Sequence, residues 1–189
     1  MRDETVARNY AEALFELAQR HEGLEVFGTG IATVAALLDE NPSFRLFLET
    51  PRVNAGDKKA VIRKAFGDRL PVSLIHFLLV TIDKRRQRLL REISREYAAL
   101  VDEHMNRAHV EVTVARELDD ESLRLVAERL SGLLGKTAIP HQRVKPQILG
   151  GVVVRAGDTI YDGSLRRRLD GLRRRLLAAG GPSGATAGE

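Results

Sequence analysis

The segment SGLLGKT, residues 131–137, ends in the Gly-Lys-Thr triplet that closes a phosphate-binding P-loop. A P-loop has the pattern Gly-x-x-x-x-Gly-Lys-Thr, because its backbone amides must wrap around the phosphates. Leu130 stands where the first glycine should be, and the segment ends a helical pattern instead of following a strand. We therefore interpret Gly135 as the end of a helix, with Lys136 beside its negative pole, and expect no nucleotide site.

Other residues that could do chemistry lack the spacing that chemistry needs. The segment GTGIAT at 28–33 has no third glycine for a dinucleotide fingerprint, and the five histidines show no HxxxH or HExxH pattern. His76 in an apolar helix is better explained as a packed or interface residue than as a metal ligand. Ser164 stands in DGSL, not in a GxSxG elbow, and is interpreted as a helix N-cap. We expect no catalytic residue, no metal and no cofactor, and hence no enzyme.

Composition narrows the classes of partner. The chain has no cysteine, which excludes disulfides, thiol catalysis and thiolate metal sites. Its 30 basic and 26 acidic residues leave a net charge of only +4, so the charge is mixed rather than basic. Aromatic residues make up 5% and tryptophan is absent, which leaves few side chains for stacking on bases. A basic nucleic-acid-binding protein stays open as the alternative function.

The hydrophobic residues are not arranged for a membrane. No run approaches the ~20 apolar residues that a membrane-spanning helix needs. The N-terminus carries acidic residues from Asp3 on and has no compact hydrophobic segment, which argues against a secretory signal and a transit peptide. We expect a cytoplasmic location.

Residues 1–107 show a helical period throughout. Val6, Tyr10, Leu14 and Leu17 lie on one face of a first helix, which Ala7, Ala11 and Ala18 widen. Further helical segments follow Gly23, Pro42, Asn54 and Pro71, and a long one covers RLLREISREYAALVDEHM. Asn54 is expected to cap its helix, with Asp57 at the third helical position and Gly67 at the end. About six helices in this length predict an all-α six-helix bundle.

The period changes after residue 108, where Val110, Val112 and Val114 alternate with polar residues as in a half-buried strand. A helix capped by Asp119 or Asp120 follows, and then a strand that Pro140 directs to a sheet edge. A hairpin turns near Gly157, after Gly150-Gly151, which we expect to allow a close approach of two chain segments. Residues 108–177 therefore predict a small α+β domain, and residues 178–189 have the composition of a disordered tail.

Two helices have unusual surfaces. The segment SLIHFLLVTI, residues 73–82, is apolar all round, so it is either central or covered by a partner on its outer face. The alanine-rich face of the first helix would form a shallow groove beside it, suited to an amphipathic helix. The terminal helix carries a stripe of leucines between two arginine triplets; these are Leu165, Leu169, Leu172 and Leu176. We expect this stripe to pack on the sheet, which leaves the arginines to face solvent or an acidic protein surface.

Four segments occur in one order and cover nearly the whole chain: VARNYAEALFELA, FLETPRVNAGDKKAVIRKAF, RRQRLLREISREYAALVDEHMNRAHVEVTVA and ILGGVVVRAGDTIYDGSLRRRLDGLRRRL. Together they resemble the delta subunit family of bacterial F-type ATP synthases, whose mitochondrial homologue is the oligomycin-sensitivity-conferring protein. The resemblance implies a non-catalytic subunit of the peripheral stalk, or stator, at the cytoplasmic face of the bacterial cell membrane. Such a role needs durable interfaces and no site chemistry.

The resemblance also implies two partners. The N-terminal domain would bind the N-terminal helix of an alpha subunit in a groove between its first and fifth helices. The matching positions are Tyr10, Ala11, Leu14, Ala18, Leu74, Phe77, Leu78 and Thr81. The C-terminal domain would join the b subunits, and Arg167 and Arg174 are our candidates for that contact.

Overall fold

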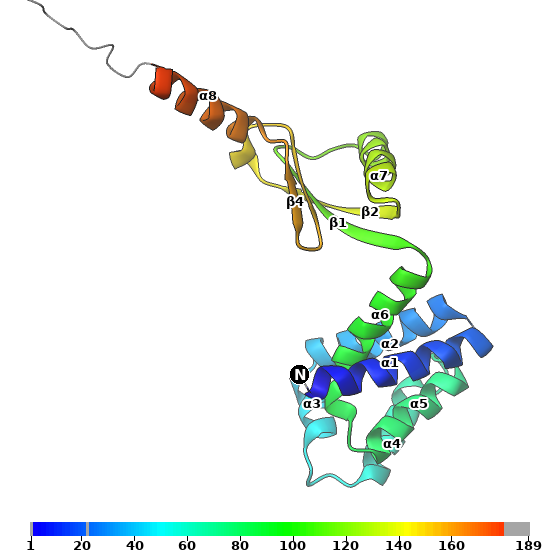
Figure 1. The fold of residues 1–189 in the computed structure, drawn as a ribbon. Coiled ribbons are helices and arrows are strands. Elements are labelled where there is room, and N and C mark those ends of the chain that lie inside the picture. The colour runs from blue at the N-terminus through cyan, green and yellow to red at the C-terminus, as the bar shows by residue number, and fades with distance from the viewer. Residues whose placement is uncertain (1, 22, 180–189) are drawn as a thin grey trace, which may run out of the picture. The chain divides into compact units, whose positions relative to one another are not determined.

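The structure is a computed structural model that describes residues 2–21 and 23–179. The chain forms two compact units, which divide between Met105 and Asn106 (Figure 1). The tail predicted at 178–189 lies, beyond Ala179, outside the described residues. Each unit is described by itself.

The first unit is helical. Its described residues form six α-helices and one 3-10 turn, η1: α1 Arg2–Arg20, α2 Leu24–Glu40, α3 Pro42–Glu49, α4 Ala55–Phe66, α5 Val72–Asp83, η1 Gln87–Leu89 and α6 Leu90–His104. The cap predicted for α4 is confirmed, because the Asn54 side chain accepts a hydrogen bond from the Asp57 amide at 2.8 Å. The side-chain amide of Asn54 in turn donates to the Asp57 carboxylate, so the two side chains are joined at the start of the helix.

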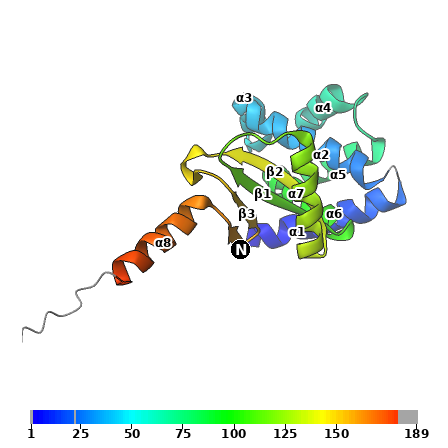
Figure 2. The same cartoon turned by 90° about the horizontal axis from the view of Figure 1, so that it is seen from above.

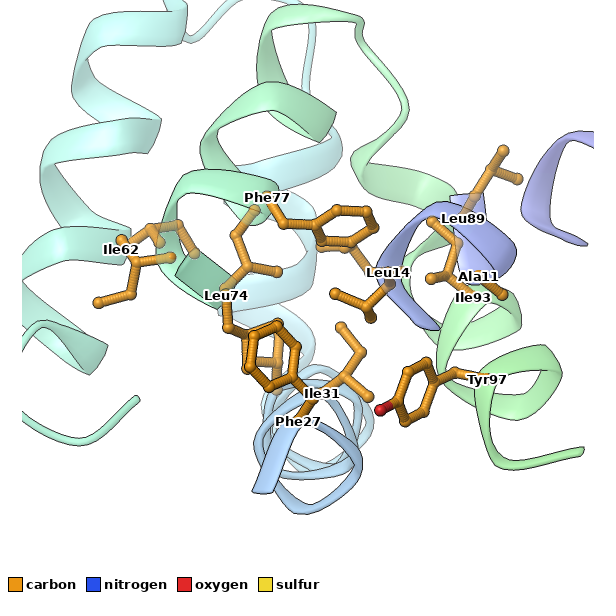
Figure 3. Packing of buried hydrophobic residues seen from close by; sticks show 14 of the residues in the cluster. Ala11, Leu14, Phe27, Ile31, Ile62, Leu74, Phe77, Leu89, Ile93 and Tyr97 are labelled. Carbon is orange, nitrogen blue, oxygen red and sulfur yellow. The ribbon is translucent and has the colours of Figure 1, made fainter. Parts of the chain in front are cut away.

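The core of this unit lies between α1, α2, α5 and α6 (Figure 3). Leu14, Phe27, Ile31, Leu74 and Ile93 are fully buried there. Burial of each such side chain contributes about 1.5–3 kcal/mol to folding. The spacing of these residues along each helix follows the helical period that the sequence shows in residues 1–107.

Helix α5 packs against α1, α2 and α4 and keeps one exposed edge, formed by Val72, His76 and Val80. Leu74, Ile75, Leu78 and Leu79 are all buried, which explains why the segment is apolar all round. Gly30 of α2 allows a close approach to it, because a side chain at that position would overlap Leu74. Burial inside the unit therefore explains the apolar residues on one side of α5, while Val72 and Val80 remain exposed.

The second unit contains a four-stranded sheet in the order β2-β1-β3-β4. Its elements are β1 Arg107–Val114, α7 Asp120–Leu134, β2 Thr137–Val144, η2 Pro146–Ile148, β3 Val152–Ala156, β4 Thr159–Asp162 and α8 Leu165–Ala179. Strands β1 and β2 pair in parallel, with α7 as the crossover helix, and the other pairs are antiparallel. The edge position predicted from Pro140 is confirmed, since β2 ends the sheet.

The two faces of this sheet differ in polarity. Val110, Val112 and Val114 are buried and pack with α7, which covers β1 and β2 (Figure 2). The alternate residues of β1, among them His109 and Glu111, point to the opposite face. That face therefore offers few apolar groups to another helix.

The prediction that the leucine stripe of α8 packs on the sheet is wrong. Leu165, Leu169, Leu172 and Leu176 are 44%, 53%, 54% and 72% exposed. Both views show α8 leading away from the sheet instead of lying across it (Figures 1 and 2). The physical reason is that α7 occupies the apolar face, and the remaining face is too polar to bury leucines.

Candidate functional site

The residues predicted to line a groove between α1 and α5 lie almost entirely inside the first unit. Ala11, Leu14, Ala18, Leu74, Phe77, Leu78 and Thr81 are buried, and Tyr10 is half-buried. Most of these side chains contact the chain's own helices, and the binding of a partner helix between α1 and α5 stays a prediction. The physical reason is that Leu74, Phe77 and Leu78 belong to the face of α5 that packs into the core of the unit.

The surface where α1 and α5 meet is formed by residues that lie next to the buried ones. The rings of Tyr10 and Phe77 meet edge to face, with centroids 6.2 Å apart, and join α1 to α5. Ala13 lies one turn from Tyr10 and is exposed, and Val80 lies one turn from Phe77 and is 48% exposed. Together, Tyr10, Ala13, Phe77 and Val80 form what we call the α1–α5 face.

The α8 surface combines apolar and cationic groups. The leucine stripe is exposed, and the helix carries six arginines against one aspartate, Asp170. Arg167 and Arg174 are exposed and lie two helical turns apart, so they point in similar directions. None of these arginines forms an ion pair within the described part of the chain. We call the leucine stripe and its arginines the α8 surface.

The start of α8 is fixed by short-range hydrogen bonds. The N-cap predicted at Ser164 is confirmed, because its hydroxyl accepts from the Arg167 amide at 3.2 Å. The Ser164 amide donates to Asp162 at 2.9 Å, and this bond lowers the pKa of the Asp162 carboxyl. The Leu165 amide donates to the Gly150 carbonyl at 2.9 Å.

The close approach predicted at Gly150-Gly151 is confirmed. Gly151 has a φ of +76°, and a side chain there would collide with the carbonyl group of Gly163. The glycine pair therefore lets the chain before β3 lie against the chain that enters α8. This contact sets the direction in which α8 leaves the sheet.

The P-loop-like segment ends α7, as the sequence predicts. Gly135 has a φ of +66° and is the C-cap of that helix. Its carbonyl accepts a hydrogen bond from the Asn106 side chain at 3.2 Å. The backbone here closes a helix and does not form a phosphate loop.

The strand register brings together two histidines whose contact the sequence did not predict. His109 Nδ1 of β1 and His141 Nε2 of β2 are 2.7 Å apart, and the rings stack. Within the described residues, no group of three or more histidine, cysteine or acidic residues is placed to hold a metal ion. His76 is exposed on α5.

A cavity of about 580 Å³ in the first unit was not predicted from the sequence. It lies at the end of α5 and is lined by Lys58, Arg85, Arg86 and Arg88. The signal in the sequence is the run KRRQR at 84–88, but basic residues at a helix C-terminus are ordinary. Only the fold shows that Lys58 joins them.

None of the helices in the described residues is long and apolar enough to cross a membrane.

Comparisons with known proteins agree over most of the chain. The sequence profile of the ATP synthase delta (OSCP) subunit family matches residues 6–176. The ATP synthase subunit delta of Gemmatimonas aurantiaca is 48% identical over 173 residues, which are 92% of this chain and 94% of that protein. The ATP synthase subunit delta of Synechocystis sp. is 38% identical over 165 residues, 87% of this chain and 89% of that one.

The fold is similar to a chain of the Toxoplasma gondii mitochondrial ATP synthase hexamer, solved by cryo-EM. The TM-score is 0.62 at 20% sequence identity, and the match covers 90% of this chain and 97% of that one. The long match to one family, from Val6 to Leu176, covers both the helical unit and the sheet unit. The chain belongs to the ATP synthase delta (OSCP) subunit family and is a non-catalytic stator subunit of the F-type ATP synthase.

Proposed function

We propose that this subunit holds the catalytic head of the synthase to its membrane-anchored b subunits through two surfaces, one in each unit. A stator must resist the torque of the rotor, so it needs contacts that stay closed while the rotor turns. The observation that carries the proposal is the α8 surface, whose leucines find no cover within the described chain. Exposed apolar stripes of this kind mark protein interfaces.

The first surface is the α1–α5 face, and its proposed partner is the N-terminal helix of an alpha subunit. An amphipathic helix could lie along Ala13 and Val80, with Tyr10 and Phe77 beneath it. The buried residues of the predicted groove, such as Leu14 and Leu78, then act as support and do not contact the partner. We assign this role to a six-helix domain of residues 1–107.

The second surface is the α8 surface, and its proposed partners are the b subunits. Docking would remove the leucine stripe from water, which stabilises the complex by about 25 cal/mol for each Å² of apolar area buried. Arg167 and Arg174 would face acidic groups on the partner and favour its approach. We assign this role to the small α+β domain of residues 108–177.

Both surfaces would work at the cytoplasmic face of the bacterial cell membrane, with the subunit held there by its partners. The family match and the bacterial relatives support this location. Nucleic-acid binding gains no support, because each of the relatives that we compare is an ATP synthase subunit.

The test is a binding assay with the full chain and two immobilised partners, an alpha-subunit N-terminal peptide and the soluble part of the b subunits. A change on one surface should weaken binding to its own partner and leave the other unchanged. If a folded variant changed on one surface loses binding to both partners, the proposal that each surface binds its own partner is wrong.

A further inference from the structure

Four cationic residues line the cavity at the end of α5, of which one is buried and three are exposed. Lys58 belongs to α4, Arg85 and Arg86 to the turn after α5, and Arg88 to η1. Two carboxylates, Asp3 and Glu49, also line the cavity, so the four cations keep an excess of two positive charges. Within the described part of the chain, none of the three arginines forms an ion pair. The residues that line the cavity therefore carry an excess of positive charge that a bound anion would offset.

Lys58 is an unusual member of this cluster because it is only 4% exposed. Its ammonium donates to the Thr50 carbonyl at 2.8 Å, which leaves two of its three protons without an acceptor among the described residues. Burial lowers the pKa of Lys58, and Arg85 and Arg88 lower it further. A buried lysine without a carboxylate partner costs stability that a bound anion would restore.

Arg85 is held in a backbone conformation that arginine disfavours. Its φ is +55°, and its amide donates to Ile82 while the Arg86 amide donates to Thr81. These two bonds form a Schellman motif, in which the left-handed position is most often glycine. An L-residue there is strained by roughly 1–2 kcal/mol. The chain thus has arginine where glycine would be more stable, and strain of this kind is common at functional sites.

The N-terminus of α4 adds backbone donors. Asn54 and Ala55 line the cavity, and the first bond within this helix is the one from the Lys58 amide to the Asn54 carbonyl. The amides of Ala55 and Gly56 precede that bond and lie at the positive end of a helix of 12 residues. Helix N-termini and arginine side chains together are the donors that phosphate groups prefer.

The geometry points to a phosphate-binding site in this cavity, formed by Lys58, Arg85, Arg86 and Arg88 with the N-terminus of α4. A tetrahedral dianion can accept hydrogen bonds from several of these donors at once, and it carries more negative charge than a single carboxylate. The cavity of about 580 Å³ has room for a phosphate and for an attached organic group. The ligand class is therefore phosphate or a phosphate monoester, either free in solution or as a lipid headgroup. This inference does not depend on the two proposed docking surfaces.

The experiment titrates the full-length protein with inorganic phosphate at constant ionic strength and follows binding by calorimetry and by ³¹P line width. We expect saturable binding that weakens at least about tenfold in Arg85→Gly and in Lys58→Met. Arg85→Gly is the decisive variant, since removing the strain should raise Tm while phosphate affinity falls. If the substitution only damaged the fold, Tm and phosphate affinity would both fall.

The matched control is Arg95→Gln, which removes one exposed positive charge of α6 outside the cavity. It should leave phosphate affinity within about twofold of the wild type, because general charge is screened at constant salt. An equal loss of phosphate affinity in Arg85→Gly and Arg95→Gln would contradict the proposed phosphate site. Absence of saturable phosphate binding would overturn it too, and so would binding of a hexaglutamate peptide without binding of phosphate.

Two further arms identify the source of the phosphate. Glycerol 3-phosphate represents a soluble monoester, and vesicles of phosphatidylglycerol with phosphatidylcholine represent a headgroup. Binding of the monoester that is lost in Arg85→Gly supports a soluble ligand, and sedimentation with vesicles that is lost in the same variant supports a lipid.

Discussion

The hydroxyl of Tyr97 on α6 donates a hydrogen bond to the backbone carbonyl of Leu24 at the start of α2, at 2.8 Å. The ring is 1% exposed and lies in the core of the first unit (Figure 3). Tyr97→Phe keeps the ring and leaves that carbonyl without its donor. We expect it to lower the free energy of unfolding by about 1 kcal/mol, measured by urea denaturation. Tyr161→Phe at an exposed tyrosine is the control and should change nothing measurable.

The same residue should make the protein sensitive to alkali. Burial raises the pKa of Tyr97 to about 12, against the usual value of about 10 in unfolded chains. The folded state therefore favours the protonated phenol, so its contribution is complete below pH 10 and is lost as the pH rises towards 12. Unfolding titrations between pH 9 and 12 should show this loss in the wild type and a smaller one in Tyr97→Phe. Equal slopes in both proteins would contradict the assignment.

The α1–α5 face predicts a contrast between an exposed and a buried position. Val80→Asp should leave the fold intact and weaken binding of an alpha-subunit peptide at least about tenfold, because Val80 lies on the surface. Ala11→Asp should instead unfold the first unit, since it places an unpaired charge in the core. Circular dichroism distinguishes the folded variant from the unfolded one. If folded Val80→Asp binds the peptide with wild-type affinity, the peptide does not bind at the α1–α5 face.

The exposure of α8 predicts that charge is tolerated in its leucine stripe. Leu169→Asp and Leu172→Asp should keep the thermal stability of the second unit within about 0.5 kcal/mol, as surface substitutions do. Both should abolish b-subunit binding. Val112→Asp in the buried strand β1 is the matched control and should unfold the unit. A stripe that packs on the sheet in solution would make Leu169→Asp behave like Val112→Asp.

The arginines of α8 should govern the rate of association more than its final affinity. Charge reversal at Arg167 and Arg174 to Glu should slow binding of the b subunits, and the wild-type rate should fall with added salt. The reason is that exposed charges are screened beyond about 10 Å at 0.1 M salt. Stopped-flow kinetics at several salt concentrations gives the comparison. A wild-type rate independent of salt and equal to that of the double variant would eliminate the electrostatic contribution.

The sequence predicted the elements that local rules control. Asn54, Asp119 and Ser164 all cap their helices, because a cap depends on residues within one turn. The change of period near residue 108 located the first strand, and Pro140 placed the edge strand. These features need no knowledge of distant contacts.

What the sequence could not predict is which surface covers an apolar helix face. A helix such as α8 shows a leucine stripe in its sequence whether its own sheet or another protein covers that stripe. The position of α5 had the same ambiguity, because burial by its neighbours α1, α2 and α4 and burial by a partner require the same apolar residues. The cationic cavity was missed for a related reason, since Lys58 and Arg85 meet only after α4 and α5 have packed.

The order of the strands has a consequence for synthesis on the ribosome. Strand β1 ends at Val114, but its two neighbours begin only at Thr137 and Val152, on opposite edges. The helices up to His104 are complete before any of this pairing can begin, so the first unit can fold while β1 waits. One edge of β1 stays open until the nascent chain has grown past β2 and the other until it has grown past β3, and open edges can pair with other chains. A ribosome that stalls before Val152 therefore displays an aggregation-prone strand, which makes this interval the one in which a chaperone would matter most.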